Sequence, residues 1–254
     1  MHNSVYVSNQ SLLLAFLLVM ISVVISWQQH LKLTKDIFIA IGRAIIQLVI
    51  VGYALQYIFK ANYLWLNAAL TLVIVFNASW NANQRDPNPR RHWWNSFVAE
   101  AVGTYLVLGV LMASGAIKPT PTQVIPITGM IAGNEMVALG LCYKALYDSF
   151  GDQRQAVLER LSLGASAFDA SRLLIQRSIK TGMQPTIDSV KTVGLVNLPG
   201  MMSGLIFAGV SPVLAIKYQI MVSFMLLAAS GLGSVIATYL AYRNYFNDRL
   251  QLKR

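Results

Sequence analysis

Long apolar stretches separated by short polar segments are the dominant pattern of this chain. Seven of them approach the roughly 20 residues of helix that cross the hydrocarbon core of a bilayer. The expected spans lie near residues 12–27, 37–59, 63–80, 96–116, 124–143, 187–210 and 212–242. The pattern therefore predicts an all-α, polytopic membrane helix bundle with about seven transmembrane helices.

One segment between the fifth and sixth spans has a different pattern. Residues 144–186 alternate charged and apolar side chains at helical spacing and are too polar to enter lipid, which predicts cytoplasmic helices. Ser166 and Asp169 resemble a capping box, so we expect one helix to end at Gly164 and the next to begin at Ser166. The expected shape is a compact knob that contacts a protein partner. A surface helix lying on lipid headgroups is the alternative.

Most of the Lys and Arg residues fall into alternate gaps between the spans. Lys32 and Lys35 follow the first span, the third gap holds three Arg residues, and seven basic residues lie between Lys144 and Lys191. The even-numbered gaps and their edges carry one lysine each. Basic side chains near span ends are retained in the cytoplasm, so we expect the N-terminus outside and the C-terminus in the cytosol.

The composition agrees with a membrane protein and argues against several other classes. Of the 254 residues, 56% are hydrophobic and 12% are charged. The net charge is +10, and the basic residues flank apolar spans. We therefore expect them to bind anionic lipid headgroups and not nucleic acid. The single Cys142 excludes an intrachain disulfide. The sequence contains no P-loop and no metalloprotease or hydrolase motif, so we expect a transport protein and not an enzyme.

Two GxxxG steps lie inside the fifth and sixth spans, at Gly129 to Gly133 and at Gly200 to Gly204. Small residues one turn apart let helix backbones approach closely, so we expect these two spans to be central packing helices. Pro199 precedes the second step. Because proline removes a helical hydrogen bond and glycine relaxes the backbone, Pro199 and Gly200 predict a flexible hinge or a static kink.

Arg43, Glu100 and Glu135 are ionisable residues that lie within the predicted spans. Charges at such depth are costly and are candidates for function by default. Arg43 and Glu100 lie near the cytoplasmic ends of their helices. We expect either an intramembrane charge pair or snorkelling to the interface.

Glu135 lies deeper and has possible metal ligands near it. Asn134 precedes it, Met130 lies within about one turn, and Met201 with Met202 opens the second glycine step. Oxygen ligands suit hard cations and thioethers suit softer ones, so these five residues are candidates for the substrate pathway. Glu135 is also a candidate metal ligand. Packing is the alternative role of the methionines.

Longer motifs resemble one family of membrane proteins. They are GRAIIQLVIVG at 42–52, FNASWNA at 76–82, IPITGMIAGN at 125–134, LSLGAS at 161–166 and DSVKTVGLVNLPGMMSGLIFAGVSP at 188–212. On these motifs the chain resembles the iron export ABC transporter permease subunits, the Fet-type B subunits, which are similar to plant aluminium-tolerance membrane proteins. The resemblance implies one ABC transporter transmembrane domain over residues 1–254, in the cell inner (plasma) membrane, with 144–186 as its coupling segment.

The resemblance also implies partners. A separate ABC ATPase subunit would bind ATP and Mg, this chain would bind no cofactor, and two copies of each subunit would form the complex. The knob then resembles a coupling helix that docks on the ATPase, and its candidate residues are Glu159, Gly164, Ala165, Ser166 and Arg172. The expected cargo is exported iron. The alternatives are an ABC permease for a nucleotide sugar or another metal, and an ATP-independent secondary transporter or channel.

Overall fold

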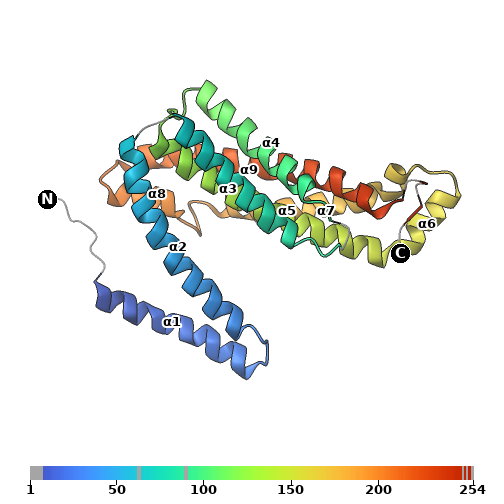
Figure 1. Cartoon of the computed structure of the whole chain (residues 1–254), viewed down its shortest axis with the longest axis horizontal. Coiled ribbons are helices and arrows are strands. Elements are labelled where there is room, and N and C mark those ends of the chain that lie inside the picture. Colours follow the sequence, from blue (N-terminus) through green and yellow to red (C-terminus); the bar gives the residue numbers. More distant parts are fainter. Residues whose placement is uncertain (1–7, 62–63, 89–90, 248, 250, 253–254) are drawn as a thin grey trace. The chain divides into compact units, whose positions relative to one another are not determined.

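The computed structural model is all-α and describes residues 8–61, 64–88, 91–247, 249 and 251–252 (Figure 1). Its elements are α1 (Asn9–Gln28), α2 (Thr34–Ala61), α3 (Leu64–Gln84), α4 (Trp93–Ala113), α5 (Pro121–Asp152), α6 (Arg154–Ser162), α7 (Ala167–Thr192), α8 (Gly200–Phe207), α9 (Pro212–Ala241) and the 3₁₀ helix η1 (Tyr242–Tyr245). The chain forms two compact units. The first, residues 1–61, contains α1 and α2, and the second, residues 62–254, contains the other elements.

The first unit is a hairpin of two apolar helices. Ser8 caps α1 through its side chain. The turn before α2 contains His30 and Lys32 at positive φ angles of 52° and 58°. Such angles cost a non-glycine residue on the order of 1 kcal/mol, so other contacts must hold the turn. One of them is made by the buried Ser26 hydroxyl, which accepts a hydrogen bond from the Leu33 N–H at 3.2 Å.

Apolar side chains cover the outside of several helices. In the first unit, Leu13 is 72% exposed and Leu48 is 73% exposed. Apolar surface of this extent is stable only in apolar surroundings. Among the described residues, five helical stretches are long and apolar enough to cross a membrane: Gln10–Gln28, Thr34–Ile58, Trp93–Ala113, Pro121–Asp152 and Pro212–Tyr245. The fold is therefore that of a multi-pass membrane protein.

In the second unit α5 is the central helix and packs against α3, α7 and α9, while α4 packs against α3 and α9. Figure 1 shows α5 and α7 extending past the ends of α3 and α4 to reach α6. Helices α5 and α7 approach closely at Gly182, where an added Cβ would lie 2.7 Å from the carbonyl oxygen of Ala138. Gly140 of α5 likewise accommodates the side chain of Arg85, whose Cδ would lie 2.6 Å from an added Cβ.

The predicted fifth span, α5, is the central helix of this unit, but the glycines of the two GxxxG steps make no close contact within its described residues, and their packing role stays a prediction. An added Cβ at Gly129, Gly133, Gly200 or Gly204 would meet nothing within 4 Å in the described part of the chain. A small-residue step marks a face that another helix can approach, but it does not specify which face is used. Here, α5 and α7 meet at a lone glycine, Gly182, outside either step.

The buried apolar side chains of the second unit form two clusters. One contains Leu139 and Leu146 of α5 with Leu174 of α7, and the other contains Ile131 of α5 with Val107 of α4. On α4, α5 and α9 the residues between the clusters include a set that we call the polar layer: Glu100, Gly103, Thr104, Asn134, Glu135, Ser230, Gly233 and Ser234. Both glutamates that are buried in the described part of the chain, Glu100 and Glu135, lie in this layer.

The predicted sixth span is not a single helix. α7 continues from the polar segment to Thr192, residues 193–199 are not helical, and α8 begins only at Gly200. Gly194 adopts a positive φ of 85°, and Pro199 has no N–H to donate. The apolar pattern runs through this break because hydrophobicity alone does not report backbone hydrogen bonding. The predicted count of seven spans is therefore not confirmed, and the direction of the termini stays a prediction.

The predicted corner between α6 and α7 is confirmed in its local detail. α6 ends at Ser162, and Gly164 adopts a left-handed φ of 89°. Ser166 accepts a hydrogen bond from the Asp169 N–H at 3.1 Å and donates one to the Asp169 carboxylate at 2.6 Å. The end of α5 differs from the prediction, because this helix continues to Asp152 and not only to about residue 143. The cytoplasmic location of 144–186 and the single domain over 1–254 stay predictions.

Candidate functional site

The side chain of Glu135 occupies a notch between three helices. Its carboxyl group lies between Gly103 of α4 and Gly233 of α9, and a Cβ added to either glycine would overlap it. Thr104 Oγ1 donates a hydrogen bond to Glu135 Oε2 at 3.3 Å. Glu135 itself is 0% exposed. The two glycines therefore leave the volume that the carboxyl group fills.

Glu100 is a second buried carboxyl group near this notch. It lies one turn before Thr104 on α4, is 0% exposed, and interacts electrostatically with Glu135. Neither oxygen of Glu100 has a hydrogen-bond partner, and Glu135 Oε1 has none either. A buried polar atom without a partner costs about 1–3 kcal/mol, and more when it is charged. Two ionised carboxylates are thus unstable side by side here unless a proton or a cation accompanies them.

A cavity of about 260 Å³ lies between α5, α7, α8 and α9. Five of the residues singled out from the sequence line it: Met130, Asn134, Pro199, Gly200 and Met201. Met202 is half-buried on α8 and is not one of the lining residues. The structure thus brings together three of the predicted pathway residues and both predicted hinge residues.

Three side chains from three helices form hydrogen bonds at this cavity. Asn134 Nδ2 donates to Ser230 Oγ at 2.5 Å and to Thr186 Oγ1 at 3.1 Å. The hydroxyl oxygens of Thr186 and Ser230 lie 3.0 Å apart. Gln219 Oε1 is buried without a hydrogen-bond partner, and Gln219 lines the same cavity. The cavity lining offers amide, hydroxyl and thioether groups but no formal charge.

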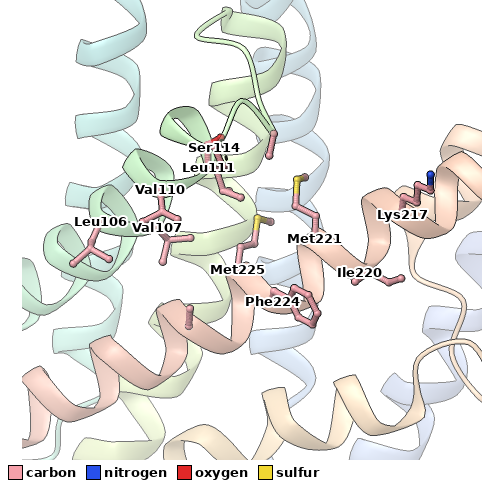
Figure 2. Close-up of a pocket in the computed structure, with 12 residues that line it drawn as sticks. Leu106, Val107, Val110, Leu111, Ser114, Lys217, Ile220, Met221, Phe224 and Met225 are labelled. Carbon is pink, nitrogen blue, oxygen red and sulfur yellow. Dashed lines mark hydrogen bonds between the residues drawn. The ribbon is translucent and has the colours of Figure 1, made fainter.

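An apolar groove of about 470 Å³ lies elsewhere in the second unit, between α4 and α9. Figure 2 shows Val107 and Leu111 of α4 on one side of the groove and Met221 and Met225 of α9 on the other. Lys217 is its one charged lining residue. None of the residues predicted from the sequence to have a function lines it, and its lining can bind only apolar groups along most of its length.

The predicted charge pair and the predicted metal ligand remain untested. Arg43 is exposed on α2 in the first unit, whereas Glu100 is buried in the second, so their pairing stays a prediction. In the described part of the chain, no group of three or more His, Cys, Asp and Glu residues could hold a metal ion. A metal at Glu135 would need other ligands as well.

The predicted ATPase-coupling residues lie around the corner between α6 and α7: Glu159, Gly164, Ala165, Ser166 and Arg172. All of them except the half-buried Ala165 are exposed. Arg160 Nη1 donates a hydrogen bond to the Ala170 carbonyl oxygen at 3.1 Å and so ties the two helices together. Leu163, at the tip of the corner, is 87% exposed. The corner is therefore fixed by a hydrogen bond between its two helices, while its tip is exposed.

Several residues of these sites were missed in the sequence. Gly103, Thr104 and Gly233 surround Glu135, and Thr186 and Ser230 bond to Asn134. Each is a small or polar residue in or near an apolar stretch, which is the signal that could have identified it. Such residues are frequent in membrane helices, so the signal alone does not select these five.

An apolar helix bundle that contains buried carboxyl groups and an uncharged polar cavity defines the class of this protein, a multi-pass α-helical membrane protein with a polar interior. Within that class the chain belongs to the family described as "Uncharacterised protein family (UPF0014)", whose model matches residues 9–246. The family resemblance expected from the sequence motifs is thereby confirmed.

Relatives in this family match nearly the whole chain. It is 53% identical over 250 residues to the Escherichia coli (strain K12) protein named "Probable iron export permease protein FetB", covering 98% of this chain and 96% of that one. It is 37% identical over 235 residues to "UPF0014 membrane protein STAR2" of Oryza sativa subsp. japonica, with 92% and 82% covered. It is 34% identical over 240 residues to "Protein ALUMINUM SENSITIVE 3" of Arabidopsis thaliana, with 94% and 88% covered. No solved structure matches the chain significantly.

Proposed function

We propose that this chain is the permease subunit of an ABC exporter for iron, because it is 53% identical, over 98% of its length, to a protein named as an iron export permease. The sequence contains no P-loop, so a separate ATPase subunit that binds ATP and Mg would hydrolyse the nucleotide. The proposed complex contains two permease chains and two ATPase chains in the inner membrane. A nucleotide sugar or another metal is the alternative cargo.

The α6–α7 corner is the proposed contact with the ATPase. Leu163 offers an exposed apolar side chain at its tip, and Arg172 offers an exposed charge nearby. Behind the tip, Val157 of α6 and Leu174 of α7 are buried in one apolar cluster with residues of α5. Close-packed interiors transmit displacement, so a force on the corner would move α5 and α7 and would not be absorbed by a loose loop.

Helix α7 is the proposed connection between the ATPase and the cavity. It contains 26 residues and is therefore about 39 Å long, at about 1.5 Å per residue. Its first turn is anchored by the Ser166 cap, and near its other end Thr186 hydrogen-bonds with Asn134 and Ser230. Through these bonds, a rigid shift of α7 would move Asn134 of α5 and Ser230 of α9 and would change the shape of the cavity.

The cavity and the adjacent polar layer form the proposed cargo pathway. Met130 and Met201 supply thioether sulfurs and Asn134 supplies an amide oxygen, which together suit a borderline cation such as Fe²⁺. Pro199 and Gly200 lie where the non-helical segment meets α8, and we propose that this joint opens and closes the cavity. Glu135 follows Asn134 directly and places negative charge beside the pathway.

Reconstitution of the chain in liposomes with a candidate ATPase tests the proposal. We expect stable association, ATP hydrolysis that iron stimulates, and iron movement that requires ATP. ATP hydrolysis without a response to iron would retain the ABC permease and would direct the search to nucleotide sugars or other metals. Iron movement without ATP, together with no association with any candidate ATPase, would favour the ATP-independent transporter or channel.

A further inference from the structure

We propose that Glu100 and Glu135 form a binding site for a divalent cation in the polar layer, with Thr104 as the positioning residue that orients Glu135. This inference rests on the proposed function, because it names a place where a transported cation would bind within the bundle. The site is distinct from the cavity at Asn134, since neither glutamate is among the residues that line that cavity.

Three carboxyl oxygens of this site have no protein partner. They are Glu100 Oε1, Glu100 Oε2 and Glu135 Oε1, and all three are buried. The fourth, Glu135 Oε2, accepts the hydrogen bond from Thr104 Oγ1 at 3.3 Å. Buried polar atoms in native proteins are nearly always hydrogen-bonded or bound to an ion. A cation that binds between the two interacting side chains would satisfy all three oxygens.

Two glycines leave the space that the Glu135 carboxyl group occupies. A Cβ at Gly103 or at Gly233 would overlap this group, so α4 and α9 are both shaped around it. A bundle that required only close packing could fill the same volume with an apolar side chain and would leave no buried polar atom unsatisfied. The polar carboxyl group is accommodated at the expense of apolar packing, which is the arrangement of a binding site.

The charge of the two glutamates selects a divalent cation. Each carboxylate carries one negative charge, so one divalent cation neutralises the pair, whereas a monovalent cation would leave a buried charge uncompensated. Among the residues that the structure describes, no basic side chain bonds to Glu100 Oε1, Glu100 Oε2 or Glu135 Oε1. Carboxylate and hydroxyl oxygens suit cations such as Mn²⁺ and Fe²⁺ better than soft ions such as Cu⁺.

The position of the site in the fold also suits a transported ion. Glu135 lies between the two apolar clusters, and its neighbour Asn134 bonds to the hydroxyls of Thr186 and Ser230 at the cavity. Ser230 and Gly233 of α9 are three residues apart, so the cavity and the carboxyl site are adjacent along both α5 and α9. An ion that leaves one site is therefore within a short distance of the other.

Binding of Mn²⁺ to the purified full chain, without any ATPase, tests the site. We would titrate Mn²⁺ into the protein in lipid nanodiscs and measure free Mn²⁺ by electron paramagnetic resonance. Glu100→Gln and Glu135→Gln preserve side-chain size, and each should weaken binding by about tenfold or more. Asp152→Asn makes the same chemical change at an exposed position of α5 and should leave the affinity unchanged. Thr104→Val should weaken binding, and Thr104→Ser should restore it.

Equal Mn²⁺ affinity of the wild type and both glutamine variants would overturn the site, as would a wild type that binds no Mn²⁺. If a glutamine variant does not fold, as judged from its melting temperature, the Mn²⁺ affinities of Thr104→Val and Thr104→Ser are compared instead. Weaker binding by the valine variant alone supports the site, and equal binding by both variants overturns it. Export is measured separately in liposomes, so a protein that binds Mn²⁺ through the glutamates but moves no iron would refute iron export and leave the cation site standing.

Discussion

Gly182→Ala should destabilise the helix bundle, because α7 meets α5 at this residue without room for a side chain. An added Cβ would overlap Cys142 Sγ and would lie 2.7 Å from the carbonyl oxygen of Ala138. The carbonyl oxygen is part of the α5 backbone and cannot rotate away, so the helices would have to separate. Overpacking of this kind costs about 1–3 kcal/mol.

Gly129→Ala is the matched control. It makes the same substitution in a helix, and therefore gains the same roughly 1 kcal/mol of helix propensity, but its Cβ would meet nothing within 4 Å. The difference between the two variants should thus equal the overpacking cost of about 1–3 kcal/mol. For a protein of this size that corresponds to a melting temperature of Gly182→Ala lower by about 2–12 °C.

Thermal unfolding of the detergent-purified variants, followed by tryptophan fluorescence, measures this difference. Adding Cys142→Ala to Gly182→Ala removes the overlap with the sulfur but not that with the carbonyl oxygen, so the double variant should regain only part of the stability. A Gly129→Ala protein that melts below Gly182→Ala would refute the reasoning. It would show that close packing occurs at the GxxxG step that the sequence predicts, and not at Gly182.

Changes at three other positions should have separable effects. Leu163→Asp should abolish co-purification of the ATPase without lowering the melting temperature, because 87% of Leu163 is exposed; an unchanged pull-down would contradict the proposed docking corner. Thr186→Val should slow ATP-dependent iron movement in liposomes by about tenfold, the effect of roughly one hydrogen bond, and Thr186→Ser should restore it. Burial raises the pKa of Asp86 above its ordinary value of 3.8, although the Asn88 N–H and the charge of Arg91 oppose this shift. The contribution of Asp86 to the free energy of unfolding is therefore fully present below pH 3.8 and is lost as the pH rises through the raised pKa. Thermal unfolding at several pH values should show this loss in the wild type and not in Asp86→Asn. A wild type that gains stability relative to Asp86→Asn over this range would refute the prediction.

Local features of the structure could be predicted from the sequence because they depend on neighbouring residues. The capping box at Ser166 and Asp169 is satisfied within one turn of helix, so its residue types were sufficient to locate it. The long apolar stretches predicted membrane helices because each must satisfy its own backbone hydrogen bonds in lipid. The break between α7 and α8 was missed, since the apolar residues continue through it.

Glu135 and Asn134 stand out in the sequence alone, because a carboxyl and an amide group inside an apolar stretch are costly wherever the helix lies. The packed bundle is needed to see that Glu135 lies against Gly103 and Gly233 while Asn134 bonds to Thr186. These contacts depend on the rotation of each helix about its own axis. Lipid is as apolar as a packed protein interior, so a membrane helix carries little sequence signal for which side faces its neighbours, and packing across the whole bundle is required to determine it.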